Sequence, residues 1–195
     1  MNRLPLTPSQ TAGPYFTMRL PEPNQHIVAR PGTLGTRIRI AGRVLDGDRN
    51  PIEDALVELW QANAAGRYHH PADTRHHVPL DPSFSGFGSV ASDFNTGSYA
   101  FETVKPGRVP DSEGGTQAPH VNIIVQARGM LLPSFTRIYF PDDSAFHPND
   151  VVLSAVPPNR RPTLIARSTG SIGGATTYGF DIRFQGDDET VFFDL

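Results

Sequence analysis

The chain has 195 residues, a formal net charge of −3 at pH 7 and no cysteine. A chain of this length buries roughly 70% of its unfolded surface, so a stable core needs no disulfide, and thiolate metal sites are excluded. The slight acidity, without any basic run, argues against a nucleic-acid partner. No apolar stretch approaches the roughly 20 residues that span a bilayer, and no secretory leader is visible. We therefore expect a cytoplasmic protein.

The predicted elements begin with an irregular, proline-rich segment, residues 1–35, interpreted as an extended N-terminal arm. Residues 36–46 alternate apolar and polar side chains, which predicts a strand with one solvated face. Long loops are predicted at 69–88 and 106–119. The remaining strands are predicted at 55–61, 97–103, 121–127, 135–140, 164–167 and 178–185, with one short helix within 148–156, capped by Asn149.

Short strands separated by turn clusters favour an all-β, single-domain β-sandwich over a βαβ fold. The sandwich is expected to span residues 36–195, with long loops and at most short helices. Trp60 is expected in its core.

The chain has seven histidines, which raise the question of a metal site. His69, His70, His76 and His77 form two adjacent pairs in a polar loop. Neighbouring side chains point apart and no zinc-ligand spacing is present, so we interpret these residues as solvated. His120 differs, because it stands where a loop enters an apolar strand, a place where sandwich proteins position functional groups.

Several longer motifs resemble those of the intradiol ring-cleavage dioxygenases. They are WQANAAGRY at 60–68, LDPSFSGFG at 80–88, GSYAFETVKPG at 97–107 and TRIYF at 136–140. The opening TPSQTAGPY at 7–15, and the ending with FDIR at 180–183 and ETVFFD at 189–194, resemble the non-iron-binding α chains of two-chain members in particular. The resemblance covers essentially the whole chain.

The resemblance implies a family site in which two tyrosines and two histidines hold a non-haem ferric iron. Carried onto this sequence, the first tyrosine is Tyr68 and the first histidine is His120. The second tyrosine position holds Val109, and the second histidine position holds Asn122. Gln117 replaces the arginine that opens the histidine motif. We therefore expect a degenerate site and no metal in this chain.

The resemblance also implies a role for such a chain in a hetero-oligomer. Its partner would be a homologous β subunit that carries Fe(III) and cleaves a small aromatic substrate, a catechol, with O2 in a higher αβ assembly. The arm, residues 1–35, would contact the partner. The residues expected to contribute to the partner's substrate pocket are Thr11, Gly13, Pro14, Tyr15 and Arg128.

Other interpretations of these residues remain open at this point. Tyr15 could be an aromatic plug in a subunit interface, and Arg128 an ordinary ion-pair residue. Tyr68 and His120 could be remnants that bond each other or the backbone in a filled pocket. The chain could also be an independently metal-binding enzyme that uses Tyr68, His120 and the loop histidines, or a non-enzymatic β-sandwich binding module.

Overall fold

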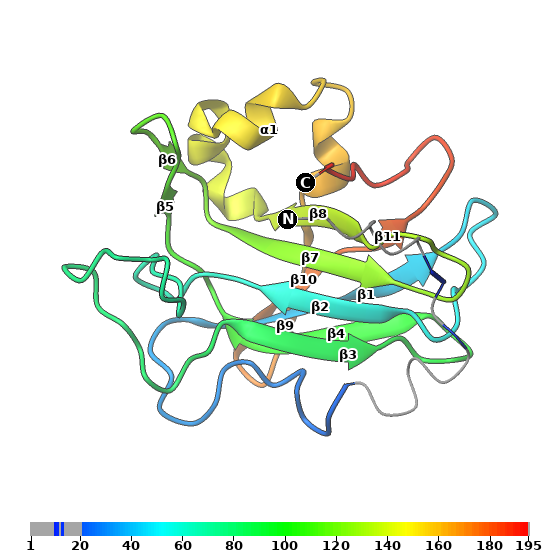
Figure 1. Cartoon of the computed structure of the whole chain (residues 1–195), viewed down its shortest axis with the longest axis horizontal. Coiled ribbons are helices and arrows are strands. Elements are labelled where there is room, and N and C mark those ends of the chain that lie inside the picture. The colour runs from blue at the N-terminus through cyan, green and yellow to red at the C-terminus, as the bar shows by residue number, and fades with distance from the viewer. Residues whose placement is uncertain (1–9, 12, 14–20, 195) are drawn as a thin grey trace, which may run out of the picture.

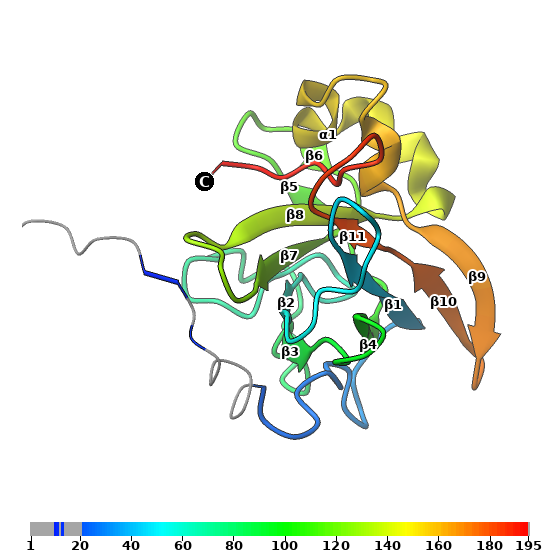
Figure 2. The ribbon, with the colours of Figure 1, turned by 90° about the vertical axis from the view of Figure 1, so that its right-hand side faces the viewer.

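The computed structural model describes residues 10, 11, 13 and 21–194, and within them two β-sheets face each other (Figures 1 and 2). One sheet contains β1 (Arg37–Leu45), β4 (Ser98–Val104), β9 (Arg167–Ile172), β10 (Ala175–Gly179) and β11 (Ile182–Arg183). The other has the order β3 (Phe87–Ala91), β2 (Leu56–Trp60), β7 (His120–Gln126) and β8 (Ser134–Tyr139), and β5 (Val109–Pro110) pairs with β6 (Thr116–Gln117) in a small separate sheet. This confirms the predicted all-β sandwich.

The strand β1 organises the first sheet. It pairs antiparallel with β4 and parallel with both β10 and β11. Ile38 and Ile40 are buried while their neighbours are partly exposed, so the predicted alternation is confirmed over most of the strand. Gly42 is required here, because an added Cβ would lie 1.7 Å from the Phe180 carbonyl oxygen.

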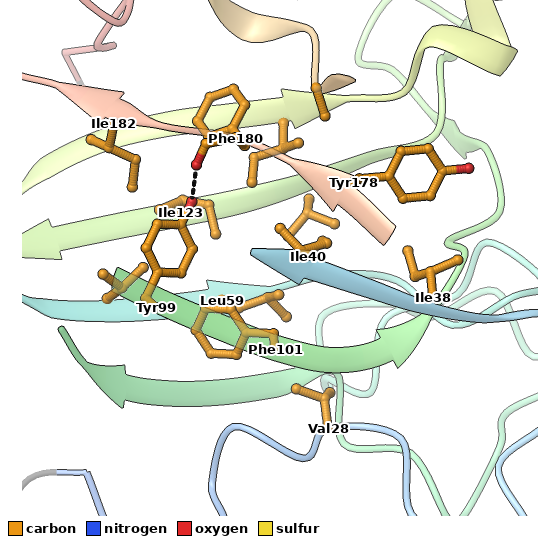
Figure 3. Packing of buried hydrophobic residues seen from close by; sticks show 14 of the residues in the cluster. Val28, Ile38, Ile40, Leu59, Tyr99, Phe101, Ile123, Tyr178, Phe180 and Ile182 are labelled. Carbon is orange, nitrogen blue, oxygen red and sulfur yellow. Dashed lines mark hydrogen bonds between the residues drawn. The ribbon is translucent and has the colours of Figure 1, made fainter. Parts of the chain in front are cut away.

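The hydrophobic core lies between the two sheets. Figure 3 shows Ile40 and Phe101 from the first sheet together with Leu59 and Ile123 from the second. All four side chains have no exposed surface. The Tyr99 hydroxyl reaches past β1 within the first sheet and donates a hydrogen bond to the Phe180 carbonyl over 2.7 Å (Figure 3).

The helices are short, as predicted, and they cover the end of the second sheet near β8 (Figure 1). They are the 3₁₀ helix η1 (Pro141–Asn149), the α-helix α1 (Val151–Ala155) and the 3₁₀ helix η2 (Arg161–Leu164). The predicted cap, Asn149, is wrong, because the buried carboxylate of Asp150 caps α1 by accepting from the Leu153 amide over 2.8 Å. Asp150 also accepts from the Ala118 amide and the Tyr139 hydroxyl, so it ties the helices to the sheet.

Two of the predicted strands are wrong. Residues 164–167 are not a strand, because η2 occupies the region up to Leu164 and β9 begins only at Arg167. The strand predicted at 178–185 is two short strands, β10 and β11, which pair with different parts of β1. The strand β3 and the β5–β6 hairpin were missed, because both lie in glycine- and proline-rich segments without clear alternation.

Residues 21–35 form the second half of the predicted arm, and they pack onto the sandwich instead of extending from it. The Val28 and Ala29 amides both donate to the Glu102 carbonyl, and both side chains belong to the hydrophobic core. Within residues 10, 11, 13 and 21–194, no helix has the length and apolarity needed to cross a membrane.

The buried Tyr99–Phe180 hydrogen bond gives a stability test. Tyr99→Phe is expected to lower the free energy of unfolding by about 1–3 kcal/mol, because a buried carbonyl loses its donor. Urea denaturation followed by circular dichroism measures the loss. Tyr178→Phe serves as the control, since its hydroxyl bonds the half-exposed Asp142 carboxylate, and its effect should be smaller. Equal losses in the two variants would contradict this account of the Tyr99 bond.

Candidate functional site

A candidate site lies at the end of the second sheet where β2 finishes and β7 begins. In the sheet register, Trp60 lies opposite Asn122, and Asn122 lies opposite Arg137 of β8. Residues directly opposite each other on neighbouring strands project from the same face. His120, two residues before Asn122, shares that face as well. The register therefore gathers four functional side chains on one side of the sheet.

Trp60, His120 and Arg137 border a cavity of about 720 Å³, a volume within the usual range of small-molecule sites. The cavity lies between the sheet, the loop after β2 and the β5–β6 hairpin, at the left of Figure 1. Its lining comprises Trp60, Tyr68, His70, Ala72, Asp73, Thr74, Arg75, Val109, Pro110, Gln117, His120 and Arg137. Trp60 is thus only half buried and lines the cavity, so its predicted core position is wrong.

The loop after β2 depends on Asn63 and Gly66. The Asn63 side-chain oxygen accepts from the Ala65 and Arg67 amides and fixes a tight turn. Gly66 has φ +82°, and a Cβ there would lie 2.0 Å from the Arg108 carbonyl oxygen. Glycine at position 66 therefore lets this loop approach the segment before β5, which brings Tyr68 and Val109 to one cavity.

The structure thus brings together the four positions that the family resemblance assigns to iron ligands. Tyr68, Val109 and His120 line the cavity, and Asn122 donates a hydrogen bond to the Tyr68 hydroxyl over 3.2 Å. The Tyr68 ring stacks on Trp60 with centroids 5.8 Å apart. Burial raises the pKa of Tyr68, so it is a neutral phenol at pH 7.

His120 is held by the backbone and not by Tyr68. Its Nδ1 donates to the Ala118 carbonyl over 2.8 Å, which leaves Nε2 as an acceptor in the neutral ring. Burial, aided by the charge of Arg137, lowers the pKa of His120 to about 4. His120 is therefore uncharged at pH 7.

The cavity carries one cation without a carboxylate partner. Asp73 pairs with Arg75 over 2.6 Å, and this hydrogen-bonded pair lowers the pKa of Asp73 to about 2. Arg137 donates to the Gln117 side-chain oxygen over 2.7 Å, but within the described part of the chain it pairs with no acid. The lining therefore has a net charge of about +1. Arg137 stands within the TRIYF motif, and its alternation with buried Thr136 and Ile138, visible in the sequence, places it on the polar face.

Ferric iron does not fit this arrangement. The anionic phenolate and imidazole donors expected at the second tyrosine and histidine positions are replaced by Val109 and by Asn122, whose amide already bonds Tyr68. The remaining donors, Tyr68 and His120, are both neutral. The Arg137 guanidinium adds repulsion to any trivalent cation placed among them.

The loop histidines do not form a metal site either. His69 bonds the Phe84 carbonyl, His70 accepts from the Ala72 amide, and His76 contacts the Arg67 guanidinium. In the portion of the chain that the structure describes, no cluster of three or more His, Cys, Asp or Glu side chains is placed to hold a metal ion.

The predicted partner-facing residues lie elsewhere, beyond the far end of β7. The Arg128 Nε lies 2.5 Å from Asp54, and the Gly129 amide donates to the Thr11 hydroxyl over 2.9 Å. The short dark-blue stretches of the N-terminal segment lie at this end in Figure 1, opposite the cavity. Gly13 is exposed, and apart from its chain neighbours no atom of the described residues lies within 4 Å of an added Cβ. Pro14 and Tyr15 lie outside the described residues.

Comparison with known proteins supports the assignment made from the motifs. A family model described as Dioxygenase matches residues 11–186. The chain therefore belongs to the intradiol ring-cleavage dioxygenase family.

Curated relatives place the chain more narrowly within that family. It is 41% identical to the protocatechuate 3,4-dioxygenase alpha chain of Burkholderia cepacia over the full length of both chains. It is 41% identical to that of Pseudomonas putida over 98% of each chain. The beta chain of the Burkholderia enzyme is 39% identical over 80% of this chain and 68% of its own length.

Solved structures support the fold. The dioxygenase domain of a carbohydrate-binding fusion protein from Streptomyces sp. SirexAA-E has a TM-score of 0.61 at 22% identity, covering 91% of this chain and 97% of its own. An intradiol ring-cleavage dioxygenase from Tetranychus urticae has a TM-score of 0.60 at 19% identity, covering 92% and 94%.

The missing ligands can be restored to test the degenerate site. The Val109→Tyr/Asn122→His variant is expected to gain the visible colour of a tyrosinate–iron(III) complex, whereas the native chain stays colourless. Adding Arg137→Gln removes a repelling charge and should tighten iron binding by about tenfold or more. Titration with ferric iron, followed by visible absorbance, measures both effects.

The matched control is Val109→Phe/Asn122→His, which supplies the ring without the second phenolate donor, so it should bind ferric iron more weakly and develop less colour than the tyrosine variant. A colourless Val109→Tyr/Asn122→His/Arg137→Gln variant would mean that these positions do not converge on a metal-sized volume.

Proposed function

We propose that this chain is the non-iron-binding α subunit of a protocatechuate 3,4-dioxygenase. In this proposal a homologous β subunit holds Fe(III), and the two assemble into a higher αβ oligomer in the cytoplasm. The assembly cleaves protocatechuate with O2 between its two hydroxylated carbons, giving 3-carboxy-cis,cis-muconate in aromatic catabolism. This chain alone is inactive.

The observation that carries the proposal is full-length identity of 41% to two α chains combined with a cavity that cannot hold iron. An independently active dioxygenase of this family would need the donors that Val109 and Asn122 replace. A family member that is degenerate at its own site, yet similar along its whole length to α chains, is best explained as a partner of a catalytic chain.

The proposed contribution to the partner's site comes from the other end of β7. Residues 1–35 form the arm that contacts the partner, and residues 36–195 form the sandwich. Thr11, Gly13, Pro14 and Tyr15 of the arm would line the partner's substrate pocket, and Arg128 would face it. The Thr11–Gly129 hydrogen bond supports this, because it holds the arm next to Arg128. Exposed Gly13, free of nearby atoms, would allow close backbone approach.

Iron content and colour test the subunit assignment directly. The full chain purified alone is expected to be colourless, free of stoichiometric iron and inactive. Co-expressed with its β partner, it should copurify in a coloured complex that consumes O2 with protocatechuate. Metal analysis, visible absorbance and oxygen uptake measure these results. Stoichiometric iron and activity in the chain alone would refute the assignment.

The arm contribution has a separate test in the αβ complex. Tyr15→Phe is expected to weaken substrate affinity by about 1–2 kcal/mol, the contribution of one hydrogen bond to a charged group. Steady-state kinetics should show this as a higher KM. Tyr178→Phe is the control, because its hydroxyl bonds Asp142 within the fold and its KM should not change. An unchanged KM for Tyr15→Phe would place this hydroxyl outside the substrate pocket.

A further inference from the structure

The degenerate cavity is open, and its chemistry differs from that of an iron site. At about 720 Å³ it has room for a small aromatic molecule. One wall is the stacked Trp60–Tyr68 pair, and Val109 and Pro110 add apolar surface from the hairpin. Such walls favour a flat ring, since aromatic side chains bury large areas and stack with offset geometry.

The polar groups of the cavity favour a single negative charge. Arg137 uses Nη1 for Gln117 and Tyr139, and in the described structure its Nε and Nη2 have no protein acceptor. A guanidinium edge with free donors binds a carboxylate in a bidentate manner. The only acidic residue in the lining, Asp73, is already neutralised by Arg75.

A further donor is available beside this cation. The Tyr68 hydroxyl accepts from Asn122, and in the described structure its own hydrogen has no acceptor. Because Asn122 lies directly opposite Arg137 in the sheet, the hydroxyl and the guanidinium are held on the same face. Both can donate toward one anion in the cavity.

We infer that this cavity is a metal-free binding site for a small aromatic monocarboxylate of the benzoate class, with Arg137 holding the carboxylate and Trp60 and Tyr68 facing the ring. The fixed cation of Arg137 supplies the positive charge, and no metal takes part. The site belongs to this chain alone, so it does not depend on the proposed assembly with a β subunit.

Calorimetric titration of the full chain tests this inference. In the presence of EDTA, 4-hydroxybenzoate should bind with one-to-one stoichiometry. The uncharged isostere 4-hydroxybenzamide should bind about tenfold more weakly or worse, a loss of about 1.4 kcal/mol. Trp60 is the only tryptophan, so its fluorescence should change as the acid saturates the site. No saturable binding of the acid, equal binding of the two compounds, or loss of binding in EDTA would overturn the inference.

Matched arginine variants locate the site. Arg137→Gln should weaken binding of 4-hydroxybenzoate by about tenfold or more. Arg128→Gln should bind like the native chain, because Arg128 lies beyond the opposite end of β7. If Arg128→Gln loses binding while Arg137→Gln keeps it, the carboxylate binds at the arm end and the inference is wrong.

A second pair of variants does not disturb the sheet. Ala72 is exposed and lines the cavity, so substitution there should not affect folding. Ala72→Glu should weaken binding of the acid several-fold by adding a negative charge, while Ala72→Gln of the same size should have little effect. Equal effects of the two substitutions would argue against a charge-selective site in this cavity.

Discussion

The register of β7 between β2 and β8 is the constraint on which the rest of this structure depends. It places Val121 and Ile123 in the core between the two sheets, where they have no exposed surface. The same register places Asn122 between Trp60 and Arg137 on the opposite face. A shift by one residue would exchange the two faces and destroy both the core and the cavity. Fold and site are therefore fixed by the same hydrogen bonds.

The two ends of β7 differ in structure. The first end carries the cavity in which the four family ligand positions meet, and there two donors are lost and Arg137 contributes a positive charge. Beyond the second end lie Arg128 and Gly129, the latter bonded to Thr11 of the arm. The two ends are separated by the length of β7, whose Val121 and Ile123 side chains are fully buried in the core. This separation explains how a degenerate family member can keep a role in an assembly.

The cavity is open, and its lining carries a net positive charge. Neutral Tyr68 and His120 would leave an uncharged, partly apolar cavity, but among the described residues Arg137 has no direct ion-pair partner, and the Asp150 carboxylate is linked to it only through the Tyr139 hydroxyl. A buried or half-buried cation without a counter-charge is unfavourable unless solvent or a ligand compensates for it. The cavity thus retains an electrostatic preference for anions in place of an affinity for a metal cation.

The sequence by itself determined the sandwich class and most strand positions, and its resemblance to the family assigned four positions to ligands. Alternation around Ile38 and Ile40 and the ordered motifs carry this information locally. The sequence could not identify the β5–β6 hairpin or the break between β10 and β11. Both features depend on which distant strand supplies the hydrogen bonds. It also misassigned the helix cap, since Asp150 was selected by bonds to Ala118 and Tyr139 far along the chain.

Only the tertiary structure decided that the degenerate site is open, that Asn122 bonds Tyr68, and that Arg137 forms no direct ion pair with a described acid and reaches Asp150 only through the Tyr139 hydroxyl. Local sequence patterns specify which residues face the same way along a strand, but not what lies opposite them after folding. The cavity exists because Gly66 lets one loop approach the segment before β5 while the sheet register brings Arg137 beside Asn122. Both are contacts between segments distant in sequence, and therefore only the folded chain defines the chemistry of the site.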